Sequence, residues 1–232
     1  MKTPQVNYRE FRLSKLNEPQ FSHLKLLSGW LVYFALYFIT ERLIPVENCF
    51  VVHSRLDDLI PFCEWFVIPY VGWYLLIVWS LWYFALYNTD GFRRLQTFII
   101  ITQLVAMAVY ILFPNMQDLR PAVFPRDNLL TRLVGVLYTA DTNTNVFPSL
   151  HVAYSIGIAS VWLKEKTANW KTKTFVVIFV VLVCLSTAFI KQHSVLDGFA
   201  ALLLCFGAEL MVYGKDYWLP KLKRVRSYVE RS

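Results

Sequence analysis

The sequence predicts an all-α, polytopic membrane protein: a bundle of six transmembrane helices, with an interfacial helix in the loop after the third span. Two observations predict this class. Of the 232 residues, 56% are hydrophobic and 17% aromatic, whereas only 17% are charged, and these values are not typical of a soluble protein. The hydrophobic residues also gather in long runs separated by short polar tracts, as expected of helices that cross a bilayer.

Six apolar runs define the predicted spans within a single domain of residues 1–232. The predicted spans are residues 26–44, 62–87, 95–113, 151–163, 175–190 and 195–213. Charged residues and Pro45 follow the first run, not the small residues of a cleavage site, so this run is expected to anchor the chain. Between the third and fourth spans, apolar residues recur at helical spacing from Leu129 to Tyr138, which predicts the interfacial helix.

The distribution of basic residues predicts the orientation. Of the 23 Lys and Arg residues, 17 lie on the side of the two termini. By the positive-inside rule, we expect both termini in the cytoplasm and residues 114–147 on the extracytoplasmic face, as in an integral protein of a bacterial plasma membrane. The net charge of +7 comes from short tracts between apolar runs, which fits anionic lipid head groups and not nucleic acid. The four cysteines lack metal-ligand spacing, so neither a metal nor another cofactor is expected.

The candidate reactive centre combines His193 and Asp197, at the junction of two apolar runs. On a helix, residues four apart share a face, so the carboxylate of Asp197 can fix the tautomer of His193 and leave it poised as a nucleophile or base. The alternative is a satisfied polar pair at a helix start. A second histidine, His151, opens the fourth predicted span on the same membrane face and favours the catalytic interpretation.

An anion is expected to bind beside these histidines. The fourth span begins near Ser149 and Leu150, where free backbone amides and the positive end of the helix dipole favour negative charge. Ser149 adds a hydroxyl, Arg120 a guanidinium suited to phosphate, and Lys191 a point charge two residues from His193. Phosphate is the natural ligand. For Lys191 the alternative is a lysine that extends its ammonium to the membrane interface.

Three fragments of the chain resemble the signature of the type 2 phosphatidic acid phosphatase and vanadium haloperoxidase superfamily. The fragments are Arg120-Pro121, Pro148-Ser149-Leu150-His151, and Ser186 with His193 and Asp197. Their order, spacing and six-span layout agree with the family across most of residues 26–213. Three residues depart from the pattern: Phe113 replaces a lysine, Leu150 a glycine and Thr187 an arginine. The second and third fragments are also similar to the inositol phosphorylceramide synthase branch.

The resemblance implies a lipid phosphate phosphatase that hydrolyses a phosphomonoester or diphosphate on a phospholipid or prenyl chain. His193, oriented by Asp197, would form a phosphohistidine, and His151 would act as general acid and then general base. Arg120, Ser149, the amide of Leu150 and Lys191 would hold the phosphoryl oxygens. Two alternatives stay open: a transferase that moves a phosphoryl head group to a second alcohol, and a weak phospholipid binder that has lost two cations. His53, Asp57 and Asp58 lie on the catalytic side and could line the entrance.

Overall fold

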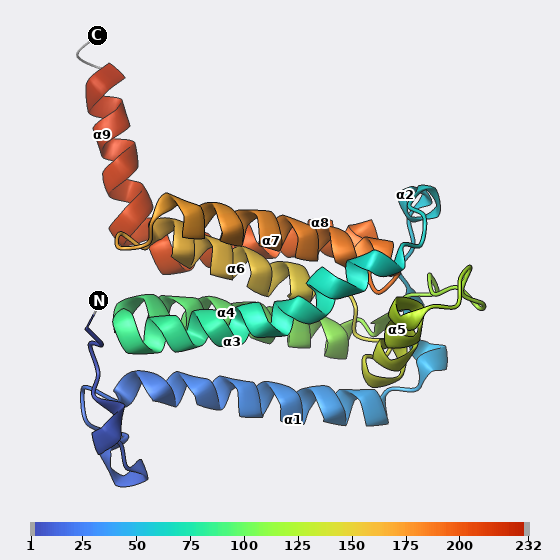
Figure 1. Cartoon of the computed structure of the whole chain (residues 1–232), viewed down its shortest axis with the longest axis horizontal. Coiled ribbons are helices and arrows are strands. Elements are labelled where there is room, and N and C mark those ends of the chain that lie inside the picture. Colours follow the sequence, from blue (N-terminus) through green and yellow to red (C-terminus); the bar gives the residue numbers. More distant parts are fainter. Residues whose placement is uncertain (1–2, 230–232) are drawn as a thin grey trace.

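The computed structural model describes residues 3–229, whose long helices lie side by side in a bundle (Figure 1). Within this part of the chain, five helical segments are long and apolar enough to cross a membrane. They are Ser22–Leu43, Glu64–Tyr87, Thr89–Leu112, Trp170–Phe189 and Val195–Ser227. Their length and composition indicate an integral membrane protein, as predicted.

The bundle is built from α-helices of very different lengths. The α-helices are α1 (Ser28–Leu43), α2 (Arg55–Leu59), α3 (Val67–Tyr87), α4 (Thr89–Leu112), α5 (Leu129–Ala140), α6 (Leu150–Lys164), α7 (Trp170–Phe189), α8 (Val195–Tyr213) and α9 (Leu219–Val229). Shorter 3₁₀ segments cover Tyr8–Glu10, Leu13–Lys15, Ser22–Leu27, Val46–Asn48 and Glu64–Phe66, and a π-helical segment covers Gly214–Trp218. Strands β1 (Phe50–Val51) and β2 (Asn115–Met116) pair in parallel and tie two loops together.

Polar side chains at the helix starts explain several of these boundaries. The side chain of Asn88 caps α4, that of Asn169 caps α7 and that of Ser194 caps α8, each accepting a bond from a backbone N–H of the first turn. Because Asn88 caps the helix, α4 begins at Thr89, six residues before the predicted third span. The prediction placed this start too late because the first turn of α4 is helical but polar.

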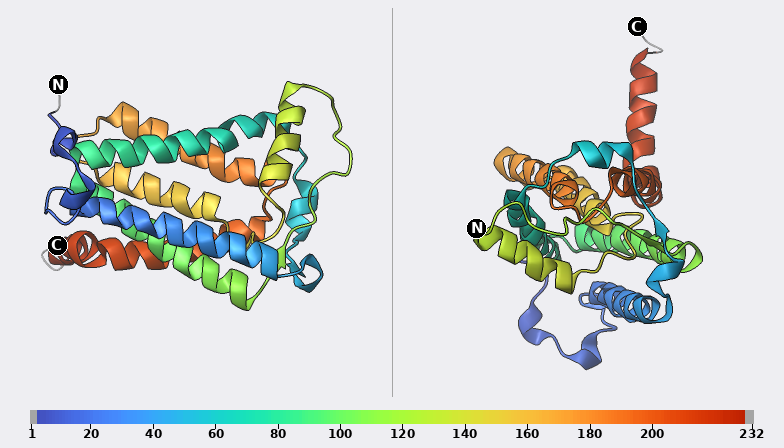
Figure 2. Two further views of the ribbon diagram at one scale, coloured as in Figure 1. Left: turned by 90° about the horizontal axis from the view of Figure 1, so that it is seen from below. Right: turned by 90° about the vertical axis from the view of Figure 1, so that its right-hand side faces the viewer.

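Helix α6 lies at the centre of the bundle and is shorter than the helices around it. It has 15 residues and packs against α3, α4, α7 and α8 (Figure 2). It corresponds to the span predicted over 151–163. On the outside of the bundle, α1 packs against α4.

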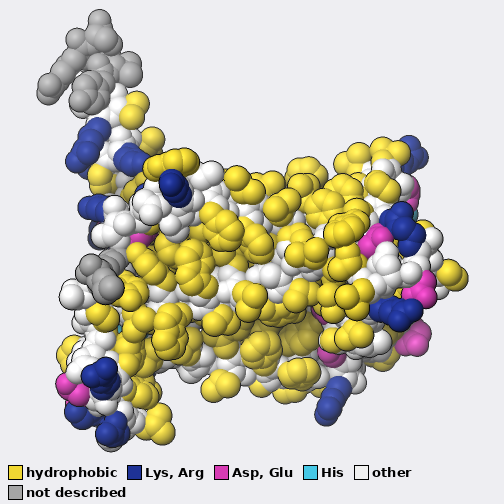
Figure 3. Space-filling view, in the orientation of Figure 1, with side chains coloured by type: hydrophobic (Ala, Val, Ile, Leu, Met, Phe, Trp, Pro, Cys, Tyr) yellow, Lys and Arg dark blue, Asp and Glu magenta, His cyan; other side chains and the backbone are white. Residues whose placement is uncertain are grey.

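The two ends of the bundle are polar and the surface between them is apolar. Hydrophobic side chains cover the long side seen in Figure 3, and charged side chains gather toward the ends. One end carries the N-terminal segment and α9, and the other carries α2 and α5 (Figures 1 and 2). The helix predicted from Leu129 to Tyr138 is confirmed as α5, whereas its position in a membrane interface stays a prediction.

Candidate active site

His193 lies in the short connection between α7 and α8, at the end of the bundle that carries α2 and α5. Helix α7 ends at Phe189, and Lys191 adopts a left-handed conformation with φ of 57°, which turns the chain away from the helix axis. The backbone N–H groups of Gln192 and His193 then both donate to the carbonyl of Thr187, at 2.9 and 3.0 Å. The expectation that His193 and Asp197 share one helix face was wrong, because His193 precedes the N-cap of α8.

The imidazole of His193 nevertheless contacts Asp197, through the first turn of α8. Its Nδ1 lies 3.0 Å from Oδ2 of Asp197 and 3.1 Å from the carbonyl oxygen of Val146. Both neighbours are acceptors, so Nδ1 carries the ring proton and Nε2 is left with a free lone pair. Oδ2 of Asp197 also accepts the backbone N–H of Ser194 at 3.0 Å, which fixes the carboxylate. The predicted contact between His193 and Asp197 is therefore present, and it leaves Nε2 as the unprotonated nitrogen.

His151 sits next to that nitrogen. Its Nδ1 is 3.3 Å from Nε2 of His193, and because Nε2 carries no proton, His151 is the donor in this contact. The ring lies against the aromatic rings of Tyr70 and Trp73, with centroid distances of 4.5 and 4.3 Å. Its own Nε2 is buried and has no hydrogen-bond partner within residues 3–229. The two histidines, 42 residues apart in sequence, thus form one pair.

The N-termini of α6 and α8 meet beside the histidine pair. The backbone N–H of Ser149 donates to the carbonyl of Asp197 at 3.1 Å, which joins the two helix starts. The hydroxyl of Ser149 accepts from the backbone N–H of Val152 at 3.4 Å and so caps α6. Ser149 is fully buried, so its hydroxyl serves the helix, whereas Leu150 lines the adjoining cavity. Two positive helix ends consequently point toward the same region.

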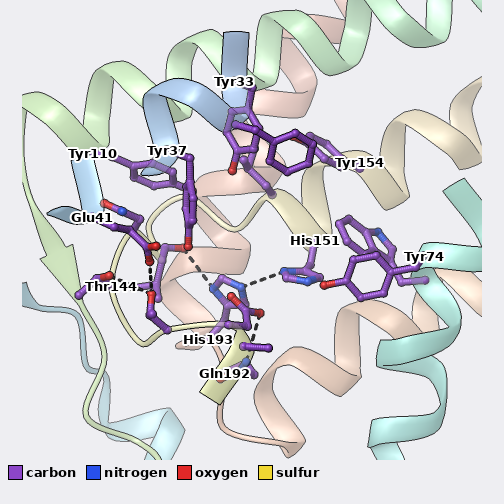
Figure 4. A pocket seen from close by; sticks show the side chains of 18 of the residues that line it. Tyr33, Tyr37, Glu41, Tyr74, Tyr110, Thr144, His151, Tyr154, Gln192 and His193 are labelled. Atoms are coloured by element: carbon purple, nitrogen blue, oxygen red, sulfur yellow. Dashed lines mark hydrogen bonds between the residues drawn. The ribbon is translucent and has the colours of Figure 1, made fainter. Parts of the chain in front are cut away.

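A cavity of about 370 Å³ opens from the histidine pair and extends between α1 and α3 (Figure 4). His151, His193 and Gln192 stand at one end, and aromatic side chains form most of the walls. The aromatic lining residues are Trp30, Tyr33, Phe34, Tyr37, Phe38, Trp73, Tyr74, Tyr110 and Tyr154. Two carboxylates, Glu41 and Asp141, also line it, and among its described lining residues there is no Lys or Arg.

Arg120 lies behind the cavity wall. Its Nη1 donates to the carbonyl of Tyr138 at 2.9 Å, and its Nη2 donates to the carbonyl of Asp141 and to Oε1 of Gln192, both at 2.6 Å. Burial lowers the pKa of the guanidinium, and the charge of Asp141 opposes this effect. Its Nε is buried and unpartnered in the described part of the chain. Arg120 is therefore separated from His193 by Gln192 and braces the loop that bears the site.

Lys191 points away from the histidine pair. Its ammonium donates to the backbone carbonyls of Asp57 and Ile60, at 2.7 and 2.6 Å, and burial lowers its pKa. It does not line the cavity. Direct contact of Lys191 with a phosphoryl group beside His193 would require a non-helical chain here, and the chain is indeed not helical. The side chain of Lys191 nevertheless points toward the α2 segment.

Other site residues could not be found from the sequence. Asn115 is fully buried, and its Oδ1 accepts the backbone N–H groups of Val146 and Phe147, which places the Val146 carbonyl on His193. Gln192 links Arg120 to Asp141. Asn115 and Gln192 are isolated side-chain amides in loops, and no sequence motif surrounds either residue. Asp57 does not line the entrance, and its capping box with Ser54 was the one signal that could have marked it.

No family model, curated protein or solved structure matches the chain. The geometry alone indicates what the site can do. A lone pair on a buried imidazole, with a proton donor 3.3 Å away and the N-terminus of α6 alongside, suits attack on an electrophile that carries negative charge.

Proposed function

We propose that the protein is an integral membrane lipid phosphate phosphatase that works through a phosphohistidine on His193. In this proposal α6 crosses the membrane as the fourth of six spans, α5 lies in the interface, the termini are cytoplasmic and the site is extracytoplasmic. The observation that carries it is the pair of contacts of the His193 ring, Nδ1 to Asp197 at 3.0 Å and Nε2 to His151 at 3.3 Å. The resemblance of three fragments to the type 2 phosphatidic acid phosphatase superfamily supports the same chemistry.

The reaction divides into two steps. Nε2 of His193 attacks phosphorus and the bond from phosphorus to the leaving oxygen breaks, while the imidazolium form of His151 gives its Nδ1 proton to the departing alkoxide and becomes neutral. Neutral His151 then takes a proton from water as the water oxygen attacks phosphorus. The bond to His193 breaks, inorganic phosphate leaves and both histidines return to their starting protonation states. The direct contact of the two rings implies that a bound phosphoryl group displaces the ring of His151 from His193.

Charge on the phosphoryl oxygens would be stabilised by the N-terminus of α6 and by Arg120. The guanidinium of Arg120 contacts the side chain of Gln192, the residue that precedes His193. Its buried Nε has no partner within residues 3–229 and would be a further donor. The aromatic cavity between α1 and α3 fits the chain of a phospholipid or prenyl phosphate, since its walls are largely apolar.

A phosphoryl head-group transferase is the second candidate. His193 is only 7% exposed and the cavity in front of it is mostly aromatic, which limits water and favours a second alcohol as acceptor. The third candidate, a weak phospholipid binder, gains support from the absence of Lys and Arg among the described cavity-lining residues. The acceptor of the phosphoryl group, water or an alcohol, distinguishes a phosphatase from a transferase. The absence of turnover would distinguish a binder from both.

The test uses purified protein with phosphatidate, phosphatidylglycerophosphate, prenyl diphosphates and sphingolipid precursors, scored for free phosphate and for transferred head group. We expect free phosphate without added alcohol and a phosphoenzyme on His193. His193→Ala should abolish both. His151→Ala should still form phosphoenzyme from a substrate with a low-pKa leaving alcohol, because such an alcohol departs without a proton. Phosphate trapped on another residue, or binding without turnover, would contradict the proposal.

A further inference from the structure

The start of α8 is held by a carboxylate from a distant part of the chain. Asp57 belongs to the five-residue helix α2 and is 2% exposed. Its Oδ1 accepts the backbone N–H of Val195 at 2.8 Å, and its Oδ2 accepts the hydroxyl of Ser194 at 2.6 Å. Oδ2 also accepts the backbone N–H of Ser54 at 2.8 Å. The carboxylate of Asp57 therefore accepts bonds at the starts of two helices: its own helix α2, and α8, which lies 138 residues later in the sequence.

A second set of bonds joins the same two segments. The ammonium of Lys191 donates to the carbonyls of Asp57 and Ile60, so α2 is attached on both sides of His193. We call these contacts of Asp57 and Lys191 the α2 clamp. With the bond from the N–H of His193 to the carbonyl of Thr187, the clamp fixes the backbone of the connection between α7 and α8.

The clamp reaches the imidazole through the first turn of α8. Ser194, which donates to Asp57, also gives its backbone N–H to Oδ2 of Asp197, the oxygen that receives Nδ1–H of His193. A shift of Ser194 would therefore move Asp197 relative to His193. Asp57 itself does not line the cavity and so has no contact with a ligand there.

We propose that Asp57 is a positioning residue that holds His193 in its Nδ1–H tautomer, with Nε2 free, by fixing Ser194 and Val195 at the start of α8. The inference rests on the proposed function in naming His193 as the nucleophile. The statement about the tautomer of His193 does not depend on the reaction that the protein catalyses.

The test compares Asp57→Asn and Asp57→Ala with the neighbouring Asp58→Asn in the full-length protein. Asp58 is exposed and contacts His53, so it is a matched control. We expect kcat to fall about tenfold in Asp57→Asn and further in Asp57→Ala, with KM unchanged because Asp57 does not touch the cavity. Asp58→Asn should behave as wild type. If Asp57→Ala does not fold, the nearly isosteric Asp57→Asn decides the outcome.

A spectroscopic measurement separates this inference from the proposed function. The chain has four histidines, and nitrogen-15 labelling of their rings reports each tautomer. In Asp57→Asn we expect the His193 signals to move from Nδ1–H toward the Nε2–H form, which is the commoner one in free imidazole side chains. An unchanged tautomer would overturn the inference even if the protein is a phosphatase. A changed tautomer would support it even if no phospholipid is turned over.

Discussion

At the scale of single residues, the local backbone conformation decides which group each polar side chain of the site contacts. The proximity of His193, Asp197 and His151 could be predicted from spacing, because a His and an Asp four residues apart near one helix start and a second histidine at another helix start are visible in the sequence. The directions of Arg120 and Lys191 could not be predicted. Lys191 occupies the left-handed region at the end of α7, and that turn sends its ammonium to the carbonyls of Asp57 and Ile60.

Lys191→Met should therefore change stability and leave substrate binding intact. The variant keeps most of the side-chain length but removes two hydrogen bonds from an ammonium to backbone carbonyls, and we expect a loss of about 1–3 kcal/mol of unfolding free energy. Thermal unfolding in detergent measures this loss. Lys166→Met, at an exposed position, is the control. A raised KM with an unchanged melting temperature would instead place the ammonium on the phosphoryl group.

At the scale of elements, the apolar runs predicted the helix positions and the polar caps set their ends. The last predicted span, 195–213, coincides with α8 because Ser194 caps its start. The predicted start of α4 was too late, because the first turn of this helix is polar and the prediction followed apolar residues. The sequence also gave no sign of the bend between α8 and α9. Helix α9 leaves the bundle at a steep angle after the π-helical segment Gly214–Trp218 (Figure 1).

We expect α9 to lie along the cytoplasmic membrane surface. Leu219, Leu222 and Val225 are all at least half exposed and gather on one side of the helix, whereas Arg224 is about 200° away from Leu222. Spin labels at positions 222 and 224, in nanodiscs that contain anionic lipid, test this arrangement.

The label at 222 should be shielded from an aqueous relaxation agent and the label at 224 exposed to it. Replacing Lys221 and Lys223 by glutamine should reduce the difference, since attraction to anionic lipid weakens. Equal exposure of the two labels in the unsubstituted helix would place α9 in water.

At the scale of the whole molecule, charge and apolar surface indicate how the bundle sits in a membrane. The apolar sides lie between two charged ends, and the site is at the end opposite the N-terminal segment and α9 (Figures 1 and 3). The sequence predicted this layout from hydropathy and basic residues. It could not predict the cavity, because its walls come from α1, α3, α4 and α6, which meet only in the folded chain.

The membrane orientation predicted from the basic residues can be tested by cysteine labelling. In a background without the four native cysteines, Thr139→Cys should react with an impermeant thiol reagent in intact cells, because residue 139 is exposed at the end that bears the site. Lys166→Cys, exposed in the connection between α6 and α7, should react only after permeabilisation. The reverse pattern would place the site in the cytoplasm.

The shortness of α6 has a consequence for the lipid itself. Fifteen residues extend for about 22 Å, against a hydrocarbon core of about 30 Å, so in the proposed six-span arrangement α6 begins below the membrane surface. In the proposed function, a head group that reaches His193 would therefore sink beneath its own leaflet boundary and shed water on the way. In a thinner bilayer that descent is smaller, which couples the rate of substrate entry to membrane thickness.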